Sequence, residues 1–215
     1  MYRVKQVKVL FLLLHYLLDG KLWDKIHYIF NFMETIYVLP VSKIEHTILQ
    51  FLSKRIELKF NCSSTILESI DKPSYAFNPN RNQYSSSKIL KEITYIIPGD
   101  ALKIIGVSVV DLYIPVLTFV FGQAILGGKA ALISLNRLKQ EYYGIPPNKG
   151  LLLERAAKEA IHEIGHTFGL THCLNNKCVM CVSNSIRKVD NKTDNFCDSC
   201  SNILKLKREK LGSED

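Results

Sequence analysis

The sequence predicts a mixed α/β domain, and three observations support that prediction. Short apolar runs rich in β-branched residues alternate with stretches whose apolar residues recur at helical spacing. Two apolar runs flank Gly127-Gly128, which is typical of a β-hairpin. A long amphipathic stretch from Asn148 to Phe168 predicts a helix with one apolar side. This order of elements favours a mixed sheet with helices packed against it.

The first half of the chain predicts two strands, a helix and a loop. Residues 36–39 form an apolar strand that Pro40 should stop, and residues 44–56 carry apolar side chains at helical spacing. A second strand is expected at residues 58–61. Polar residues, prolines and asparagines between residues 71 and 87 predict a loop.

The second half predicts the elements that would hold a site. A helix is expected at residues 87–97, a strand at residues 102–112, and hairpin strands at residues 118–126 and 129–135. The segment 119–126 is the leading candidate for an exposed strand edge that pairs with an extended peptide. The helix 148–168 has an apolar stripe for the sheet, formed by Leu153, Ala157, Ala160, Ile164 and Phe168.

Composition limits the classes of function that fit. The 215 residues carry a net charge of +8, and 47% of them are hydrophobic, as in an ordinary globular domain. The basic run of Lys205, Lys207, Arg208 and Lys210 is interpreted as a solvated helix terminus, with nucleic-acid binding as a minor alternative.

The N-terminal residues 1–32 differ from the rest and are interpreted as an extension. Their apolar run, residues 9–18, is too short to span a bilayer, and no signal-peptide cleavage site follows it. We expect Met33 to be the native start and residues 33–215 to form one domain. That domain would divide into an upper part, residues 33–169, and a lower part, residues 170–215.

The stretch from His162 to His172 reads H-E-x-x-H-x-x-G-x-x-H. On a helix, His162 and His166 lie one turn apart on one face, so that one metal ion can bind both. Gly169 can adopt a left-handed conformation that ends the helix and returns His172 as a third ligand. Three His ligands with an open fourth position are the pattern of a catalytic zinc site. Glu163, beside the first ligand, is the candidate general base.

Five of the six cysteines lie between residues 173 and 200, and their density favours a metal site over a disulfide framework. Soft thiolates in this number suit a structural zinc ion in a reducing, cytoplasmic setting. Two ligand sets are possible from the residues alone. One is Cys173, Cys178, Cys197 and Cys200; the other replaces Cys173 with Cys181, and its spacing is slightly closer to that of a zinc ribbon. Cys62 stands apart and is expected to be a small buried hydrophobe.

The string from His162 through Cys173, Cys178, Met180, Cys197 and Cys200 resembles the archaemetzincin family of zinc metallopeptidases. Weaker similarity extends upstream to about Met33, for example at Phe119-Val120-Phe121-Gly122. The resemblance implies a metzincin-like twisted mixed sheet on the active-site helix and a small zinc-stabilised C-terminal subdomain. It also implies that Met180 lies in a turn beneath the catalytic zinc ion. The implied ligands of a second, structural zinc ion are Cys173, Cys178, Cys197 and Cys200, which leaves Cys181 as a spare thiol.

The expected function is zinc-dependent hydrolysis of peptide bonds by a monomeric enzyme, with peptides or proteins as substrates. A non-catalytic zinc module that binds nucleic acid or protein is the alternative, although a purely structural site does not need Glu163. Side chains of neighbouring residues in an extended chain point to opposite sides. We therefore hypothesise that the structural zinc ion, bound through Cys173, fixes the loop that carries His172.

Overall fold

The computed structural model describes residues 34–213, so the expectations for residues 1–32 and for Met33 lie outside the described part. Its main sheet has five strands in the order β2-β1-β5-β8-β7. Their bounds are Thr35–Val41 for β1, Ser63–Ile66 for β2, Ala101–Ser108 for β5, Gly122–Ala124 for β7 and Ala130–Ser134 for β8. Four strands are parallel and β7 runs antiparallel to β8, which confirms the mixed sheet.

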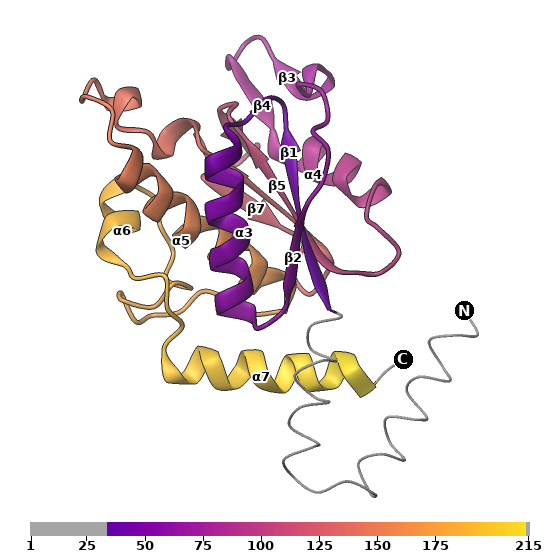
Figure 1. The fold of residues 1–215 in the computed structure, drawn as a ribbon. Coiled ribbons are helices and arrows are strands. Elements are labelled where there is room, and N and C mark those ends of the chain that lie inside the picture. Colours follow the sequence, from indigo (N-terminus) through magenta and orange to yellow (C-terminus); the bar gives the residue numbers. More distant parts are fainter. Residues whose placement is uncertain (1–33, 214–215) are drawn as a thin grey trace, which may run out of the picture.

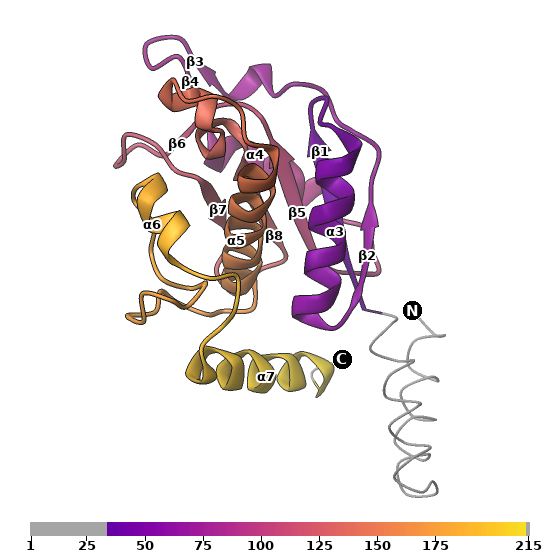
Figure 2. The same ribbon diagram turned by 60° about the vertical axis from the view of Figure 1, so that its left-hand side comes forward.

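Helices cover both faces of this sheet (Figures 1 and 2). Helices α3 (His46–Phe60) and α5 (Lys149–Thr167) pack on one face, and α4 (Ser86–Tyr95) packs on the other. A small second sheet joins β3 (Phe77–Asn78), β4 (Gln83–Ser85) and β6 (Leu112–Tyr113). The C-terminal part holds α6 (Ile186–Asn191) and α7 (Asp198–Ser213), and α7 crosses the lower end of the sheet in Figure 1. Within the described residues, no helix has the length and apolar character needed to cross a bilayer.

The strand expected at residues 58–61 is wrong, because these residues close helix α3. The apolar spacing of Leu52, Ile56 and Phe60 continues the buried stripe of the helix, and all three side chains are buried. Asn61 then takes a left-handed conformation with φ 46° and ends the helix. The second strand follows it as β2.

Pro40 does not stop β1, which continues to Val41. The carbonyl groups of Val38 and Pro40 both accept hydrogen bonds on the β2 side of the strand. The ring nitrogen of Pro40 lies on the same side of the strand. There it has no β2 partner, because β2 ends at Ile66. A proline there removes no ladder hydrogen bond.

The remaining expected elements are present, but several are shorter. The loop at residues 71–87 contains β3, β4 and a 3₁₀ turn, Ser74–Ala76. The strand expected at residues 102–112 divides into β5 and β6. The hairpin is confirmed by the antiparallel pairing of Gly122 with Ile133, although only residues 122–124 of its first arm join the main sheet. Two further 3₁₀ turns, Asn136–Leu138 and Gln140–Tyr143, lead into α5.

Candidate metal centre

Helix α5 begins after Asn148 and ends before Gly169, as the sequence predicted. The Asn148 side chain accepts a hydrogen bond from the Leu151 amide, which caps the N-terminus. At the other end Gly169 has φ +84°, as expected. The hairpin turn also holds this end, because the Gly127 amide donates to the His166 carbonyl group. The buried Lys103 ammonium donates to the carbonyl oxygens of Thr167 and Gly128, at 2.8 Å each.

The three histidines of the motif converge on one point. His162 and His166 come from α5 and His172 from the following loop, and their candidate ligand nitrogens lie within 4.8 Å of one another. The Nε2 atoms of His162 and His166 are 3.1 Å apart. Tetrahedral ligands about 2.0–2.1 Å from a zinc ion stand about 3.3 Å from each other, so this spacing suits a shared ion.

Backbone carbonyl groups orient the two helical rings. His162 Nδ1 donates to the Val179 carbonyl oxygen at 2.8 Å, and His166 Nδ1 donates to that of Leu170 at 2.7 Å. Each bond fixes the tautomer that leaves Nε2 as the free ligand atom. Burial also lowers the pKa of all three imidazoles, most strongly that of His162. The neutral, metal-binding form is therefore favoured at neutral pH.

Glu163 is buried beside the edge strand β7, and its exposed fraction is only 6%. A Cβ atom on Gly122 would stand 2.6 Å from Glu163 Cγ and 2.7 Å from its Oε1. Glycine at position 122 is therefore what lets this carboxylate approach the strand. Burial raises the pKa of Glu163 well above its usual range, and the nearby Glu159 raises it further.

A buried ion pair lies one helical turn before Glu163. Lys192, which directly follows α6, places its ammonium group 2.9 Å from the Glu159 carboxylate, and both side chains are less than 5% exposed. The same ammonium group donates to the Cys181 carbonyl oxygen at 3.3 Å. Lys192 therefore connects α5 to the C-terminal part of the chain.

Met180 packs against α5 between the ligand histidines. It is fully buried, and a Cβ atom on Gly165 would stand 2.6 Å from its sulfur atom. The Met180 carbonyl oxygen accepts a hydrogen bond from the Cys173 amide at 2.9 Å. This contact binds the turn of Met180 to the segment that follows His172.

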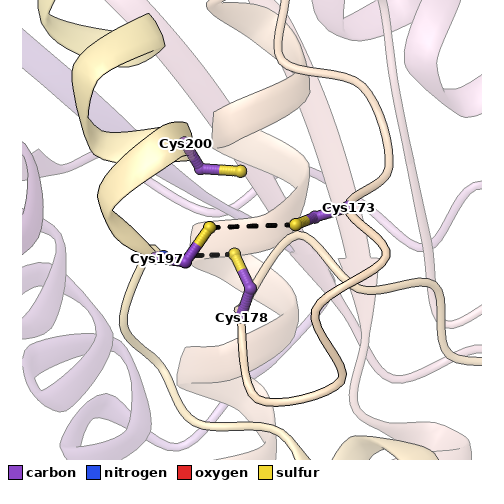
Figure 3. Close-up of side chains that lie close together, drawn as sticks. All are labelled: Cys173, Cys178, Cys197 and Cys200. Atoms are coloured by element: carbon purple, nitrogen blue, oxygen red, sulfur yellow. Dashed lines mark hydrogen bonds between the residues drawn. The ribbon is translucent and has the colours of Figure 1, made fainter.

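Four cysteines form a second cluster (Figure 3). The sulfur atoms of Cys173, Cys178, Cys197 and Cys200 lie within 4.8 Å of one another. Those of Cys173 and Cys197 are 3.8 Å apart, close to the separation of about 3.8 Å between tetrahedral thiolates on zinc. Hydrogen bonding from the Cys200 backbone lowers the pKa of the Cys197 thiol to about 7, whereas burial raises the pKa of the Cys178 and Cys200 thiols.

The other two cysteines lie outside this cluster. The Cys181 sulfur is not in the group of four, although its backbone pairs with that of Cys173. Cys62 is 4% exposed within the core, as expected for a small hydrophobe, and burial raises the pKa of its thiol to about 12. All six cysteines are free thiols.

Sequence reasoning missed Gly122, Gly165 and the Glu159–Lys192 pair. A glycine inside a strand often marks a close approach, so Gly122 carried a usable signal. Nothing in the local pattern pairs Lys192 with Glu159, because they come from different parts of the chain.

Comparison with known proteins agrees with this geometry. A model of "Peptidase family M54" matches residues 26–208, beginning slightly before Met33. The archaemetzincin of Methanocaldococcus jannaschii is 49% identical over 165 residues, covering 77% of this chain and 89% of the relative.

Solved structures show the same fold. The crystal structure of the archaemetzincin of Methanopyrus kandleri matches with a TM-score of 0.74 and 30% identity, over 82% of this chain and 96% of the other. A zinc-dependent peptidase from Methanocorpusculum labreanum matches with a TM-score of 0.72 and 30% identity, over 79% and 99% of the two chains.

Proposed function

Since the chain belongs to peptidase family M54, the archaemetzincin zinc metallopeptidases, we propose that it hydrolyses peptide bonds with a zinc-activated water and with Glu163 as the general base. The observation that carries the proposal is the convergence of three imidazoles that could share one metal ion, together with a buried carboxylate at the residue that follows His162. A purely structural zinc site needs no such carboxylate. This favours catalysis over a zinc module that only binds nucleic acid or protein.

In the proposed mechanism, each residue of the motif has one role. His162, His166 and His172 hold the catalytic zinc ion, which when bound supplies Lewis acidity and a more acidic water. Glu163 accepts a proton from the attacking water and returns it to the leaving amine. Its burial keeps bulk water away from the carboxylate, and the contact with Gly122 fixes its position against the strand.

We assign a second, structural zinc ion to Cys173, Cys178, Cys197 and Cys200, and we place Met180 beneath the catalytic ion. The close sulfur positions and the burial of Met180 against Gly165 support these roles. Free thiols throughout favour a reducing, cytoplasmic location, where the chain would act as a monomer.

Metal removal tests the proposed activity. Purified protein is incubated with a peptide library before and after chelator treatment, and new termini are read by mass spectrometry. We expect cleavage that chelation abolishes and zinc restores. Salt-dependent binding to DNA or RNA without any zinc-dependent cleavage would favour the binding module instead.

A further inference from the structure

An open cavity of about 540 Å³, lined by polar and charged residues, lies next to the segment that precedes β7. Two arginines from distant segments line it. Arg81 comes from the turn between β3 and β4, and Arg137 from the turns that precede α5. The other lining residues are Asn82, Gln83, Asp111, Thr118, Asn136 and Tyr142. We call this cavity the Arg81–Arg137 pocket.

Both guanidinium groups are held in place, and each keeps one nitrogen free. Arg81 donates through Nε to Gln83, and through Nη2 to the carbonyl oxygens of Leu117 and Thr118 at 2.9 and 3.0 Å. Arg137 donates through Nε and Nη2 to the Asp111 carboxylate at 2.6 and 2.7 Å. Within residues 34–213, the Nη1 atom of neither arginine has a protein acceptor.

Aromatic rings fix the planes of the two groups. Arg81 lies over the ring of Tyr113, 4.3 Å from its centroid. Arg137 lies over Phe119 at 4.2 Å and over Tyr142 at 4.8 Å. With Asp111 as the only carboxylate of the lining, two guanidinium charges face one negative charge. Such a rigid, positively charged pocket suits a carboxylate ligand.

The pocket is placed to meet a peptide that pairs with β7. Phe121 and Ile125 bond to β8, so the amide and carbonyl groups of Gly122 and Ala124 point to the free side of this terminal strand. The free edge stops at Val120, whose amide donates to Leu112. Thr118 lines the pocket four residues before Gly122, so at most about 13 Å of chain separates the two.

We propose that the Arg81–Arg137 pocket binds a carboxylate of the substrate on the C-terminal side of the cleaved bond. A peptide antiparallel to β7 passes Ala124 first and Gly122, next to Glu163, second. Its C-terminal part therefore continues toward Thr118 and the pocket. The carboxylate is either the C-terminus of the peptide or an acidic side chain, within about four residues of the cleaved bond. This inference rests on the proposed peptidase function.

The test compares three forms of one hexapeptide that the wild-type protein cleaves. The first ends in a free carboxylate, the second in an amide, and the third in an amide with Glu as its last residue. We expect kcat/KM to fall by about tenfold or more from the first form to the second. Recovery with the third form would show that the pocket also accepts an acidic side chain, and no recovery would restrict it to the C-terminus.

Variants at the lining residues then show whether the preference for the acid form over the amide form depends on the pocket. Arg81→Gln should remove the difference between acid and amide, Arg81→Lys should restore part of it, and the charge-matched Lys88→Gln on α4 should leave it unchanged. Asn82→Asp, at an exposed lining position, should reduce cleavage of the acid form more than cleavage of the amide form. This variant tests the pocket even if Arg81→Gln does not fold. Binding of the acid and amide forms to Glu163→Gln gives a readout without turnover.

The two proposals fail in different ways. If the wild-type protein cleaves no peptide, the proposed function falls. If it cleaves all three forms equally, or if Arg81→Gln and Asn82→Asp keep the wild-type preference, the pocket assignment is wrong while the peptidase activity stands.

Discussion

Buried polar and charged side chains at the histidine site each need a partner, and most have one within the fold. His162 donates to Val179, and Lys192 neutralises Glu159. Glu163 differs, because its carboxylate is buried without an ion-pair partner among the described residues, and burial raises its pKa. A bound zinc ion would supply the missing positive charge beside it. Glu159 and Lys192 bring one charge each, so their pair adds rigidity without adding net charge.

Loss of Lys192 should therefore destabilise the protein strongly. In Lys192→Met the Glu159 carboxylate stays buried without its cation, and we expect the free energy of unfolding to fall by about 3–5 kcal/mol. Adding Glu159→Gln should cost much less than the sum of the single changes. Urea denaturation measures both effects, with Lys188→Met on the exposed side of α6 as the control. A Lys192→Met protein as stable as this control would contradict the role of the pair.

Elements with local signals at both ends could be predicted from the sequence, and elements defined by tertiary contacts could not. Helix α5 had its Asn148 cap, its apolar stripe and Gly169, so its bounds were accurate to a residue. The strand expected at residues 58–61 was wrong because a short apolar run fits either a strand or the last turn of a helix. The β7 strand was expected too long, since residues before Gly122 turn toward β6. The convergence of His162, His166 and His172 could be predicted because their spacing is local, whereas Lys192 contacts Glu159 across the fold.

Gly122→Ala tests whether turnover depends on the position that Gly122 allows the Glu163 side chain to take. The added methyl group would stand 2.6 Å from Glu163 Cγ and 2.7 Å from the Leu132 carbonyl oxygen, so the carboxylate or the strand must move. Because a misplacement of about 1 Å can cost about 100-fold in rate, we expect kcat to fall by that order while zinc remains bound. Gly99→Ala is the control, since a methyl group there meets no atom within 4 Å. Wild-type turnover in Gly122→Ala would refute this role for glycine.

The cysteine cluster and the histidine site share two short stretches of backbone. Cys173 follows His172, and Val179, whose carbonyl group orients His162, lies between Cys178 and Met180. Cys197 precedes helix α7 and Cys200 lies within it, and Arg208 of α7 bonds to the Phe60 carbonyl group at the end of α3. The C-terminal segments that contact the three histidines of the motif therefore meet at the cysteine cluster.

Cysteine substitutions test this coupling. We expect Cys173→Ser to lose one zinc ion per chain and Cys181→Ser to keep both, as measured by elemental analysis. The zinc ion that remains in Cys173→Ser should be removed by chelator more readily than in the wild-type protein, because His172 has lost its anchored neighbour. Loss of zinc only in Cys181→Ser would overturn the ligand set, and independent loss of the two ions would overturn the coupling.

The role of Glu163 as general base is tested most directly by the turnover of Glu163→Gln, with its metal content measured on the same sample. The amide keeps the size of the side chain but cannot accept the proton of the attacking water. We expect the variant to bind as much zinc as the wild-type protein and to cleave the best library peptide at least about 100-fold more slowly. Wild-type rates in a fully zinc-loaded Glu163→Gln protein would contradict the assignment of Glu163 as the general base.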